Sequence, residues 1–240
     1  MVLSGKDLSE GSVKMEVITT DAMRTVADAA GWDSGLQYDV YQKEEKTSAG
    51  KGYLFIKRMF DIAASIAAGI VLLLPMLLIA VLVRIDSHGP ALFRQERLGK
   101  GGKPFTILKF RTMYTYAPAN MATNEIDIRK YTTKLGKFLR EYSIDELPQL
   151  WNVFIGNMSF VGYRPVCLSE NKLNTLRKKY GVFVMKPGIT GYAQVSGRDN
   201  IGTDEKARMD LFYVEHCSVA LDICCILKTV KTVLTREGVK

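Results

Sequence analysis

The chain has few residues of the kinds that build metal centres and disulfide frameworks. Its 240 residues include four cysteines and two histidines, and no two cysteines have the C-x-x-C spacing. This pattern excludes a zinc finger or a similar site of Cys and His ligands. We therefore expect free thiols in a reducing, cytosol-facing compartment, where they serve as small core or interface residues. They are Cys167, Cys217, Cys224 and Cys225.

The chain also lacks internal repeats, long low-complexity tracts and any motif that reads a nucleic-acid groove. The last absence argues against a nucleic-acid partner. Residues 1–52 are polar and lack the apolar stretch of a signal peptide, so we interpret them as an N-terminal extension. Composition divides the rest into a membrane helix at 53–85 and a cytosolic or interfacial domain at 86–240.

The net charge of +8 is unevenly distributed along the chain. Residues 1–52 hold nine Asp and Glu against six Lys and Arg, whereas residues 53–240 hold 16 against 27. A basic body suits polyanionic partners, such as phosphorylated substrates and anionic lipid head groups.

The longest uncharged run is Ile62–Val83, with 22 residues. Its length is that of a transmembrane helix, but Pro75 lies inside it and predicts a kink. The arm before Pro75 has 13 residues from Ile62, or about 20 Å of helix, less than the ~30 Å of a hydrocarbon core. Lys and Arg flank the run on both sides, whereas a spanning helix has its excess on one side. We therefore expect a re-entrant helix, with an ordinary span as the alternative.

The rest of the pattern predicts an α/β fold of mainly helical character. Alternating residues on both sides of Gly99–Gly102 predict a small β-hairpin. We expect helices over 128–141, 168–180 and 204–216, and a loop over 186–198. The segment 219–234 is amphipathic, which suits either an interfacial helix or one packed on the core. The polar face of the hairpin would carry several of Arg94, Arg97, Lys109 and Arg111.

Two adjacent carboxylates, Asp145 and Glu146, stand out in this basic body. Ser143 and Glu146 have the spacing of a capping box, which would make the acids a helix N-terminus. Pro148 opposes this interpretation, because proline belongs in the first turn of a helix. If the helix starts near Pro148, the two acids lie just before it.

Several stretches in order carry a resemblance to a known family. They are Pro75 in the apolar run, KFRTM at 109–113, SIDELPQLWNV at 143–153, GNMSFVGYRP at 156–165 and KPGITGYAQVSGR at 186–198. Together they resemble the bacterial sugar transferases that act on polyprenyl phosphate, the monotopic phosphoglycosyl transferases. The resemblance extends from about Ile56 to Gly238.

The resemblance implies a reaction and a site. Such enzymes move a phosphosugar from a UDP-sugar to undecaprenyl phosphate on the cytoplasmic face of the bacterial inner membrane and release UMP. Asp145 would be the nucleophile, and Mg²⁺ would be held by Asp145 and Glu146. Glu146 is also a candidate acceptor for a proton. Phosphate groups would be bound by Arg140, Arg164 and Arg198, with further candidates at Gln95, Arg97, Lys109 and Arg111.

The chain departs from the family pattern at three places. Asn157 stands where the family usually has Asp, Tyr163 where it usually has Pro, and Leu74 where Ser often precedes the proline. Two other interpretations stay open: a direct transfer in which Asp145 only holds Mg²⁺, and a non-catalytic membrane scaffold. The sugar and the number of copies in a homo-oligomer are not predicted.

Overall fold

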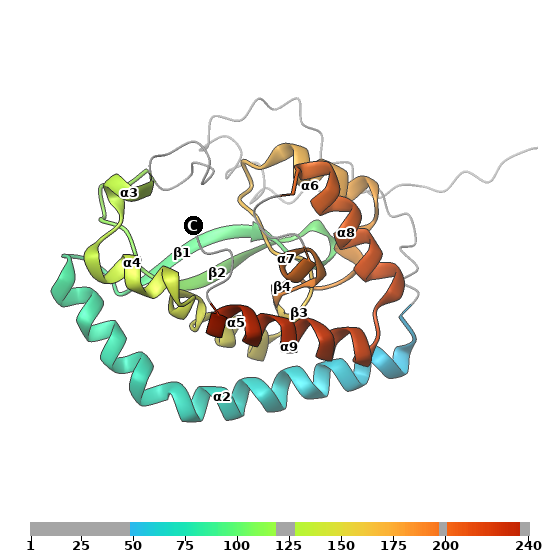
Figure 1. Cartoon of the computed structure of the whole chain (residues 1–240), viewed down its shortest axis with the longest axis horizontal. Coiled ribbons are helices and arrows are strands. Elements are labelled where there is room, and N and C mark those ends of the chain that lie inside the picture. Colours follow the sequence, from blue (N-terminus) through green and yellow to red (C-terminus); the bar gives the residue numbers. More distant parts are fainter. Residues whose placement is uncertain (1–48, 119–127, 197–200, 236–240) are drawn as a thin grey trace, which may run out of the picture. The chain divides into compact units, whose positions relative to one another are not determined.

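The structure of the protein is a computed structural model, which describes residues 49–118, 128–196 and 201–235. All of them belong to one compact unit, residues 46–240. Its longer elements are α2 (Lys51–Asp86), β1 (Leu92–Leu98), β2 (Pro104–Phe110), α4 (Lys134–Glu141), α5 (Gln149–Ile155), α6 (Asn171–Lys179), α8 (Thr203–His216) and α9 (Val219–Thr235). Shorter ones are α3 (Ile128–Tyr131), β3 (Ser159–Val161), β4 (Gly188–Thr190) and α7 (Tyr192–Ser196). The described part is therefore mainly helical, as predicted (Figure 1).

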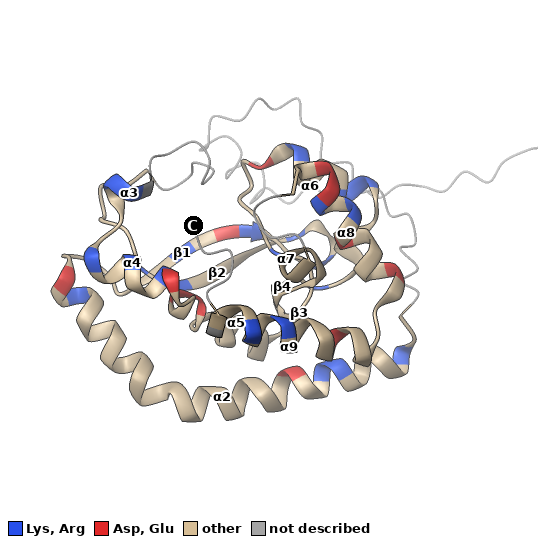
Figure 2. Ribbon diagram, in the orientation of Figure 1, with Lys and Arg blue, Asp and Glu red and all other residues tan. Residues whose placement is uncertain are grey.

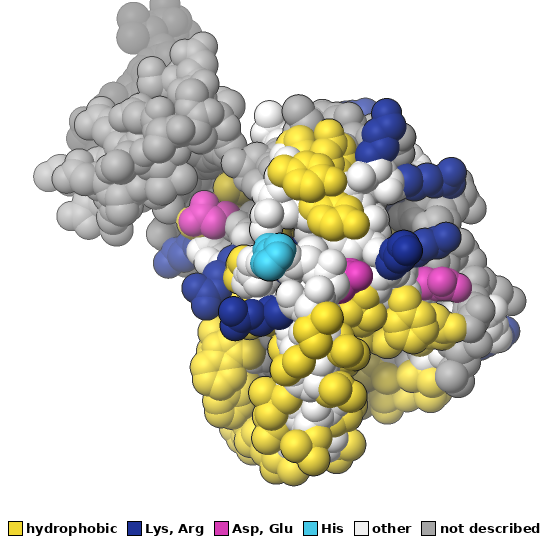
Figure 3. All heavy atoms as spheres, turned by 90° about the vertical axis from the view of Figure 1, so that its left-hand side faces the viewer, with side chains coloured by type: hydrophobic (Ala, Val, Ile, Leu, Met, Phe, Trp, Pro, Cys, Tyr) yellow, Lys and Arg dark blue, Asp and Glu magenta, His cyan; other side chains and the backbone are white. Residues whose placement is uncertain are grey.

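Helix α2 contains the whole apolar run. It has 36 residues, and among the described helices it alone is long and apolar enough to cross a membrane. Figure 1 shows that it bends along its course, and Pro75 lies within it. Its middle part carries no charge in Figure 2, and hydrophobic side chains gather over the lower part of the face in Figure 3. Leu74 is 76% exposed, so this apolar surface lacks cover from the rest of the described chain.

The N-terminal part of α2 is bonded to the rest of the unit. Arg58 donates to the carbonyl oxygens of Val153 and Phe154 at the end of α5, both at 2.7 Å. Asp61 is 2% exposed and accepts hydrogen bonds at 3.0 Å from the hydroxyl of Ser159 and the backbone N–H of Phe160. The contacts of Arg58 give hydrogen-bond donors to carbonyl groups at the C-terminus of α5. Those of Asp61 supply the hydrogen bonds that a buried carboxylate needs.

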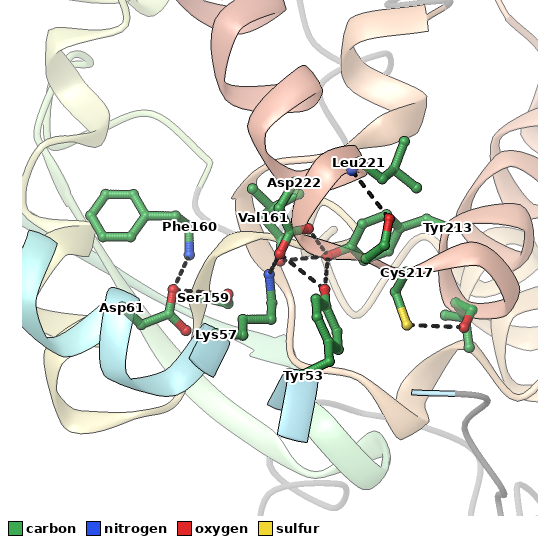
Figure 4. A network of polar contacts seen from close by, with 12 residues as sticks. Tyr53, Lys57, Asp61, Ser159, Phe160, Val161, Tyr213, Cys217, Leu221 and Asp222 are labelled. Atoms are coloured by element: carbon green, nitrogen blue, oxygen red, sulfur yellow. Dashed lines mark hydrogen bonds and ion pairs between the residues drawn. The ribbon is translucent and has the colours of Figure 1, made fainter. Parts of the chain in front are cut away.

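A second network joins the start of α2 to α8 and α9 (Figure 4). Asp222 of α9 accepts hydrogen bonds from Lys57 at 2.7 Å, from Tyr53 at 2.9 Å and from Tyr213 at 2.6 Å. The partners come from α2 and α8, so one carboxylate connects three helices.

The C-terminal end of α2 is capped by Arg111, which follows β2. Its Nη1 donates to the carbonyl oxygen of His88 at 2.6 Å, and its Nη2 donates to those of Ser87 at 2.6 Å and Val83 at 3.4 Å. Carbonyl groups at a helix end lack partners within the helix, and the guanidinium supplies them. Both ends of α2 are therefore held by the same unit.

The predicted hairpin is confirmed as the antiparallel pair β1 and β2. Gln95 lies opposite Ile107 and Lys109 opposite Phe93, so Gln95, Arg97 and Lys109 lie on one face of the sheet. Arg94 is exposed and lies on the other face.

The helix before the acidic pair is interrupted. We expected one helix over 128–141, but the structure has α3 and α4 with Thr132 and Thr133 between them. The backbone N–H of Thr133 donates to Thr112 at 3.0 Å, and its hydroxyl accepts from Gly136 at 2.9 Å as the N-cap of α4. Thr133 therefore ends one helix and starts the next.

The loop predicted over 186–198 is wrong in part, because it contains a strand and a helix. Strand β4 pairs in parallel with β3, with Ser159 opposite Gly188 and Val161 opposite Thr190. A Cβ atom on Gly188 would lie 2.1 Å from the backbone nitrogen of Gly162. The two backbones approach this closely only because these positions are glycine.

Helix α9 has two apolar stripes. Cys225 is 1% exposed and belongs to the core formed with Val161, Tyr213 and Val214. A second stripe is open, at Val219, Ile223, Leu227 and Val230, with Leu227 64% exposed. The helix packs on the core, which confirms that alternative, and its exposed apolar face leaves an interfacial position as a prediction.

Asn152 fixes α5 against the edge of β2. Its side-chain oxygen accepts from the N–H of Leu108 at 3.0 Å, and its side-chain nitrogen donates to the carbonyl of Thr106 at 2.7 Å. The side chain is 1% exposed. Asn152 therefore takes the place of a neighbouring strand and sets the position of the segment that precedes α5.

We expect Asn152→Leu to lower the free energy of unfolding by about 2–4 kcal/mol, because it leaves a buried N–H and a buried C=O without partners. Thermal unfolding followed by circular dichroism in detergent measures the loss. The control is Asn171→Leu at the exposed start of α6, which should change the stability by less than about 0.5 kcal/mol. Equal melting temperatures for the two variants would show that the bonds to β2 contribute nothing.

Candidate active site

The acidic pair lies in a 3₁₀ turn, Ile144–Glu146, between α4 and α5. Ser143 before it has φ 55° and ψ 21°, the left-handed conformation, and its side chain makes no capping hydrogen bond. The capping box predicted from Ser143 and Glu146 is therefore wrong, since the backbone turns at Ser143 instead of entering a helix. Helix α5 starts at Gln149, just after Pro148, so the pair precedes the helix as the alternative predicted.

Glu146 joins two cations from distant segments. The Nζ of Lys109 on β2 lies 2.7 Å from its Oε1, and the Nη2 of Arg164, just after β3, lies 2.7 Å from the same oxygen. Nη1 of Arg164 donates to Oε2 at 3.4 Å. The side chain of Glu146 is 13% exposed and that of Arg164 is 46% exposed. The ion pair of Glu146 and Arg164 therefore joins a mostly enclosed carboxylate to a half-exposed guanidinium.

Opposing effects act on the pKa of Glu146. Burial alone would raise the pKa, but the charges of Arg164 and Lys109 and their hydrogen bonds outweigh burial and hold the pKa well below its usual range. Glu146 is therefore ionised, and it fixes the two cations beside Asp145.

Asp145 has a different environment. Its side chain is 11% exposed, its Oδ2 lies 4.0 Å from the Nζ of Lys109, and its carboxylate accepts no hydrogen bond from the described residues. Burial raises the pKa of Asp145; the charge of Lys109 lowers it, that of Glu146 raises it, and those of Arg140 and Arg164 lower it. This carboxylate lies in the field of several cations and forms a long ion pair with Lys109, but no described residue donates a hydrogen bond to it, which leaves its oxygens available to a ligand.

The structure brings most of the predicted cations toward this pair. Arg140 lies in the last turn of α4 and its charge acts on Asp145. Arg97 donates a hydrogen bond to Gln95, and the charges of Arg164 and Glu146 act on it. Its Nε is buried without a hydrogen-bond partner in the described part of the chain.

Of the other two predicted cations, one is bonded elsewhere and one is not described. The Nη1 and Nη2 donors of Arg111 are bonded to the carbonyls of His88 and Ser87 just after α2, so in this structure the guanidinium caps that helix. Arg198 lies outside the described residues.

The donor set fits a hard divalent cation. Among described residues there is no group of three or more His, Cys, Asp and Glu side chains that could enclose a metal. Magnesium is often held instead by one or two carboxylates together with substrate phosphates. Asp145 fits this role, because no described group donates to it. Both oxygens of Glu146 already accept from cations, so Glu146 would have to give up one of those bonds.

Sequence reasoning missed the residues that hold this cluster in place. Asn152, Arg58 and Arg177 each bond a backbone carbonyl far away in the sequence. Their residue types carried no signal of this, because a buried Arg and an exposed one look alike in a sequence. In the sequence, Lys57 and Arg58 indicate only the positive charge that flanks the apolar run.

Comparisons with known proteins identify a family. The family described as bacterial sugar transferase matches residues 52–236. The chain is 39% identical over 189 residues to an uncharacterized sugar transferase, EpsL, of Bacillus subtilis, which covers 78% of this chain and 91% of that protein. It is 41% identical over 192 residues to a UDP-glucose:undecaprenyl-phosphate glucose-1-phosphate transferase of Caulobacter vibrioides, covering 76% of this chain and 71% of the relative. With an undecaprenyl-phosphate galactose phosphotransferase of Salmonella typhimurium the identity is 37% over 201 residues, 77% of this chain and 41% of the relative. The chain thus spans less than half of some of these longer relatives.

Proposed function

Because this chain belongs to the bacterial sugar transferase family, we propose that it transfers a sugar 1-phosphate from a UDP-sugar to undecaprenyl phosphate and releases UMP. Two relatives carry names that describe this type of transfer. The observation that supports it best is Asp145, a buried carboxylate with no hydrogen bond from described residues, beside Lys109 and within the field of Arg140 and Arg164. A cluster of cations around an unbonded carboxylate suits the attack of that carboxylate on a phosphate.

In the first step an oxygen of Asp145 attacks the β-phosphorus of the UDP-sugar. A new P–O bond forms to the carboxylate, and the bond between that phosphorus and the bridging oxygen breaks. UMP leaves with the electron pair, so a sugar phosphate remains on Asp145 as an acyl phosphate. Lys109 and Arg164 offset the negative charge of the diphosphate, which would otherwise repel the carboxylate.

In the second step a phosphate oxygen of undecaprenyl phosphate attacks the same phosphorus. The bond to Asp145 breaks, the carboxylate is regenerated, and the product is a lipid diphosphate sugar. A phosphate monoester is largely dianionic at pH 7, so the acceptor needs little help from a base. We therefore assign Glu146 to holding Lys109 and Arg164, since a carboxylate with a strongly lowered pKa is a weak proton acceptor.

Magnesium, when bound, would be held by Asp145, with Glu146 as a second ligand, and would supply positive charge to the diphosphate. The cations of the chain itself do the remaining work of binding and orientation. Arg140, Arg97 and Gln95 lie in segments that can extend phosphate binding beyond Lys109 and Arg164.

We also propose a membrane arrangement, and the contacts at the two ends of α2 support it. Arg58 and Asp61 bond its N-terminal part to α5 and β3, and Arg111 bonds its C-terminal end to the segment after β2. A helix that crossed the bilayer would have its two ends about 30 Å apart on opposite sides, and one compact unit would not hold both. This supports a re-entrant helix in the cytoplasmic leaflet of the bacterial inner membrane. The open apolar stripe of α9, and the exposed Trp151 on α5, would then lie in the interface, with Lys and Arg facing anionic lipid.

We expect positions at the two ends of α2 to be accessible from the same side of the membrane. Single cysteines at Lys51 and His88, in a variant whose native cysteines are replaced by alanine, are labelled with an impermeant maleimide in vesicles of both orientations. Both positions should react only in inside-out vesicles, together with the control Lys172→Cys on α6. Labelling of Lys51 and His88 from opposite sides would establish an ordinary span.

The reaction is tested with purified protein in detergent, undecaprenyl phosphate, Mg²⁺ and a panel of radiolabelled UDP-sugars. With one or a few of the UDP-sugars, we expect the radiolabel to pass into the organic phase as lipid product while UMP is released. Without the lipid acceptor, neither product should form at steady state. Absence of lipid product with every sugar would contradict the proposed function and favour the scaffold interpretation.

A further inference from the structure

Helix α6 holds both ends of the short segment that carries Arg164. Nη1 of Arg177 donates to the carbonyl oxygen of Arg164 at 2.9 Å, and the side chain of Asn174 donates to the carbonyl oxygen of Cys167 at 3.0 Å. Asn174 and Arg177 are three residues apart, so they lie on the same face of the helix. Arg177 is 2% exposed and Asn174 is 9% exposed. Two buried donors of one helix thus fix the backbone of residues 164–167.

Arg177 is itself held in a fixed orientation. Its Nε and Nη2 lie 2.8 Å and 2.7 Å from Oδ2 of Asp210 on α8, and both side chains are 3% exposed. The ring of Tyr163 lies over the guanidinium, 5.1 Å from its central carbon, and packs edge-on against Phe183. Tyr163 is one of the positions where this chain departs from the family pattern, and its ring helps to enclose the pair.

The same segment is connected to a second cation of the site. Cys167 forms an isolated antiparallel bridge with Arg97 on β1. A shift of residues 164–167 would therefore move the backbone under Arg164 and disturb the backbone of Arg97. The held segment thus links α6 to two of the cations around Glu146.

We propose that Arg177 and Asn174, with Asp210 behind them, are positioning residues that set the place of Arg164 for catalysis. The inference rests on the proposed function. A buried ion pair is by itself weak evidence for stability, because desolvation costs about as much as the attraction returns. Here the pair has a further use, since it aims one donor at the backbone of a residue that touches Glu146. The side chain of Arg164 is half-exposed and long, so its backbone must be fixed for its guanidinium to be placed reproducibly.

The test uses Arg177→Lys, which keeps a positive charge beside Asp210 but loses the planar group that reaches two partners. We expect kcat/KM for the UDP-sugar to fall by about 10- to 100-fold, mainly through kcat. The effect should nearly vanish, to less than about twofold, when Arg164 is already replaced by alanine, because the change acts through Arg164. The matched control is Lys172→Met, which removes an exposed ion pair to Asp204 between the same two helices. It should leave kcat/KM within about twofold of the wild type.

Hydrogen–deuterium exchange supplies a readout that does not depend on activity. Backbone amides of the peptide spanning 161–168 should exchange faster in Arg177→Lys than in the wild type. In Lys172→Met their exchange rates should equal those of the wild type. Equal exchange in all proteins, or a loss of kcat/KM that is as large without Arg164 as with it, would overturn the inference. If the wild type transfers no sugar, the proposed function fails, and exchange alone decides whether α6 holds this segment.

Discussion

Asp145→Asn is expected to lower kcat by at least about 10³-fold, with every UDP-sugar that the wild type uses. The amide has nearly the shape of the carboxylate, but its oxygen is a far weaker nucleophile and it carries no charge. Steady-state release of UMP in the presence of undecaprenyl phosphate measures the loss. A variant that retains more than about a tenth of the wild-type kcat would contradict a covalent role for Asp145.

The same substitution should leave the fold intact or stabilise it. Burial raises the pKa of Asp145, which means that its ionised form is less favourable in the folded protein than in the unfolded chain. At pH values above that raised pKa, removing the charge therefore removes a cost. The carboxylate also accepts no hydrogen bond from described residues whose loss could offset this gain. A melting temperature equal to or above that of the wild type would separate a chemical defect from a folding defect.

Glu146→Gln is expected to lower kcat/KM by about 10²-fold. The substitution removes the charge that fixes Lys109 and Arg164, so both cations lose their orientation next to Asp145. The kinetic control is Glu96→Gln, an exposed acid on the opposite face of β1, which should have no effect. Equal kcat/KM in Glu146→Gln and the wild type would show that the ion pairs do not serve the reaction.

The stability of Glu146→Gln carries its own signature. The pKa of Glu146 is depressed in the folded protein, so its ion pairs stabilise the fold above the unfolded-state pKa of about 4.3, and this contribution is lost as the pH falls toward the folded-state pKa. The variant should therefore unfold at a lower temperature than the wild type at pH 7, and the difference should shrink below about pH 4. Melting curves from pH 3 to pH 7 measure it, and a difference independent of pH would contradict the assignment.

Local patterns in the sequence predicted the elements that carry their own signals. The hairpin around Gly99–Gly102, the uncharged run in α2 and the acidic pair before Pro148 are each visible within about twenty residues. In the structure, Lys109 lies beside both Asp145 and Glu146, and Arg164 is paired with Glu146. The two cations come from segments far from the acidic pair in the sequence.

The errors have physical causes. Strands β3 and β4 have three residues each and depend on glycines at close approach, so alternation has no room to show. The prediction of a capping box was wrong because Ser143 adopts a left-handed backbone conformation, which the residue type does not indicate. The bonds of Arg111 at the end of α2 were not predicted, because they join it to a segment more than twenty residues away. Arg177 and Asp210 pair across 33 positions, a separation that no helix or strand period encodes.

The central claim is that Asp145 carries the sugar phosphate, and a lipid-free burst tests it most directly. Micromolar enzyme is mixed with Mg²⁺ and the preferred UDP-sugar without undecaprenyl phosphate, and UMP is quantified over the first seconds, followed by mass analysis of the quenched peptide that contains Asp145. We predict release approaching one UMP per enzyme, a peptide heavier by one sugar phosphate, and neither product in Asp145→Asn. No burst from a protein that turns over once the lipid is added would contradict the covalent intermediate and establish direct transfer in a ternary complex.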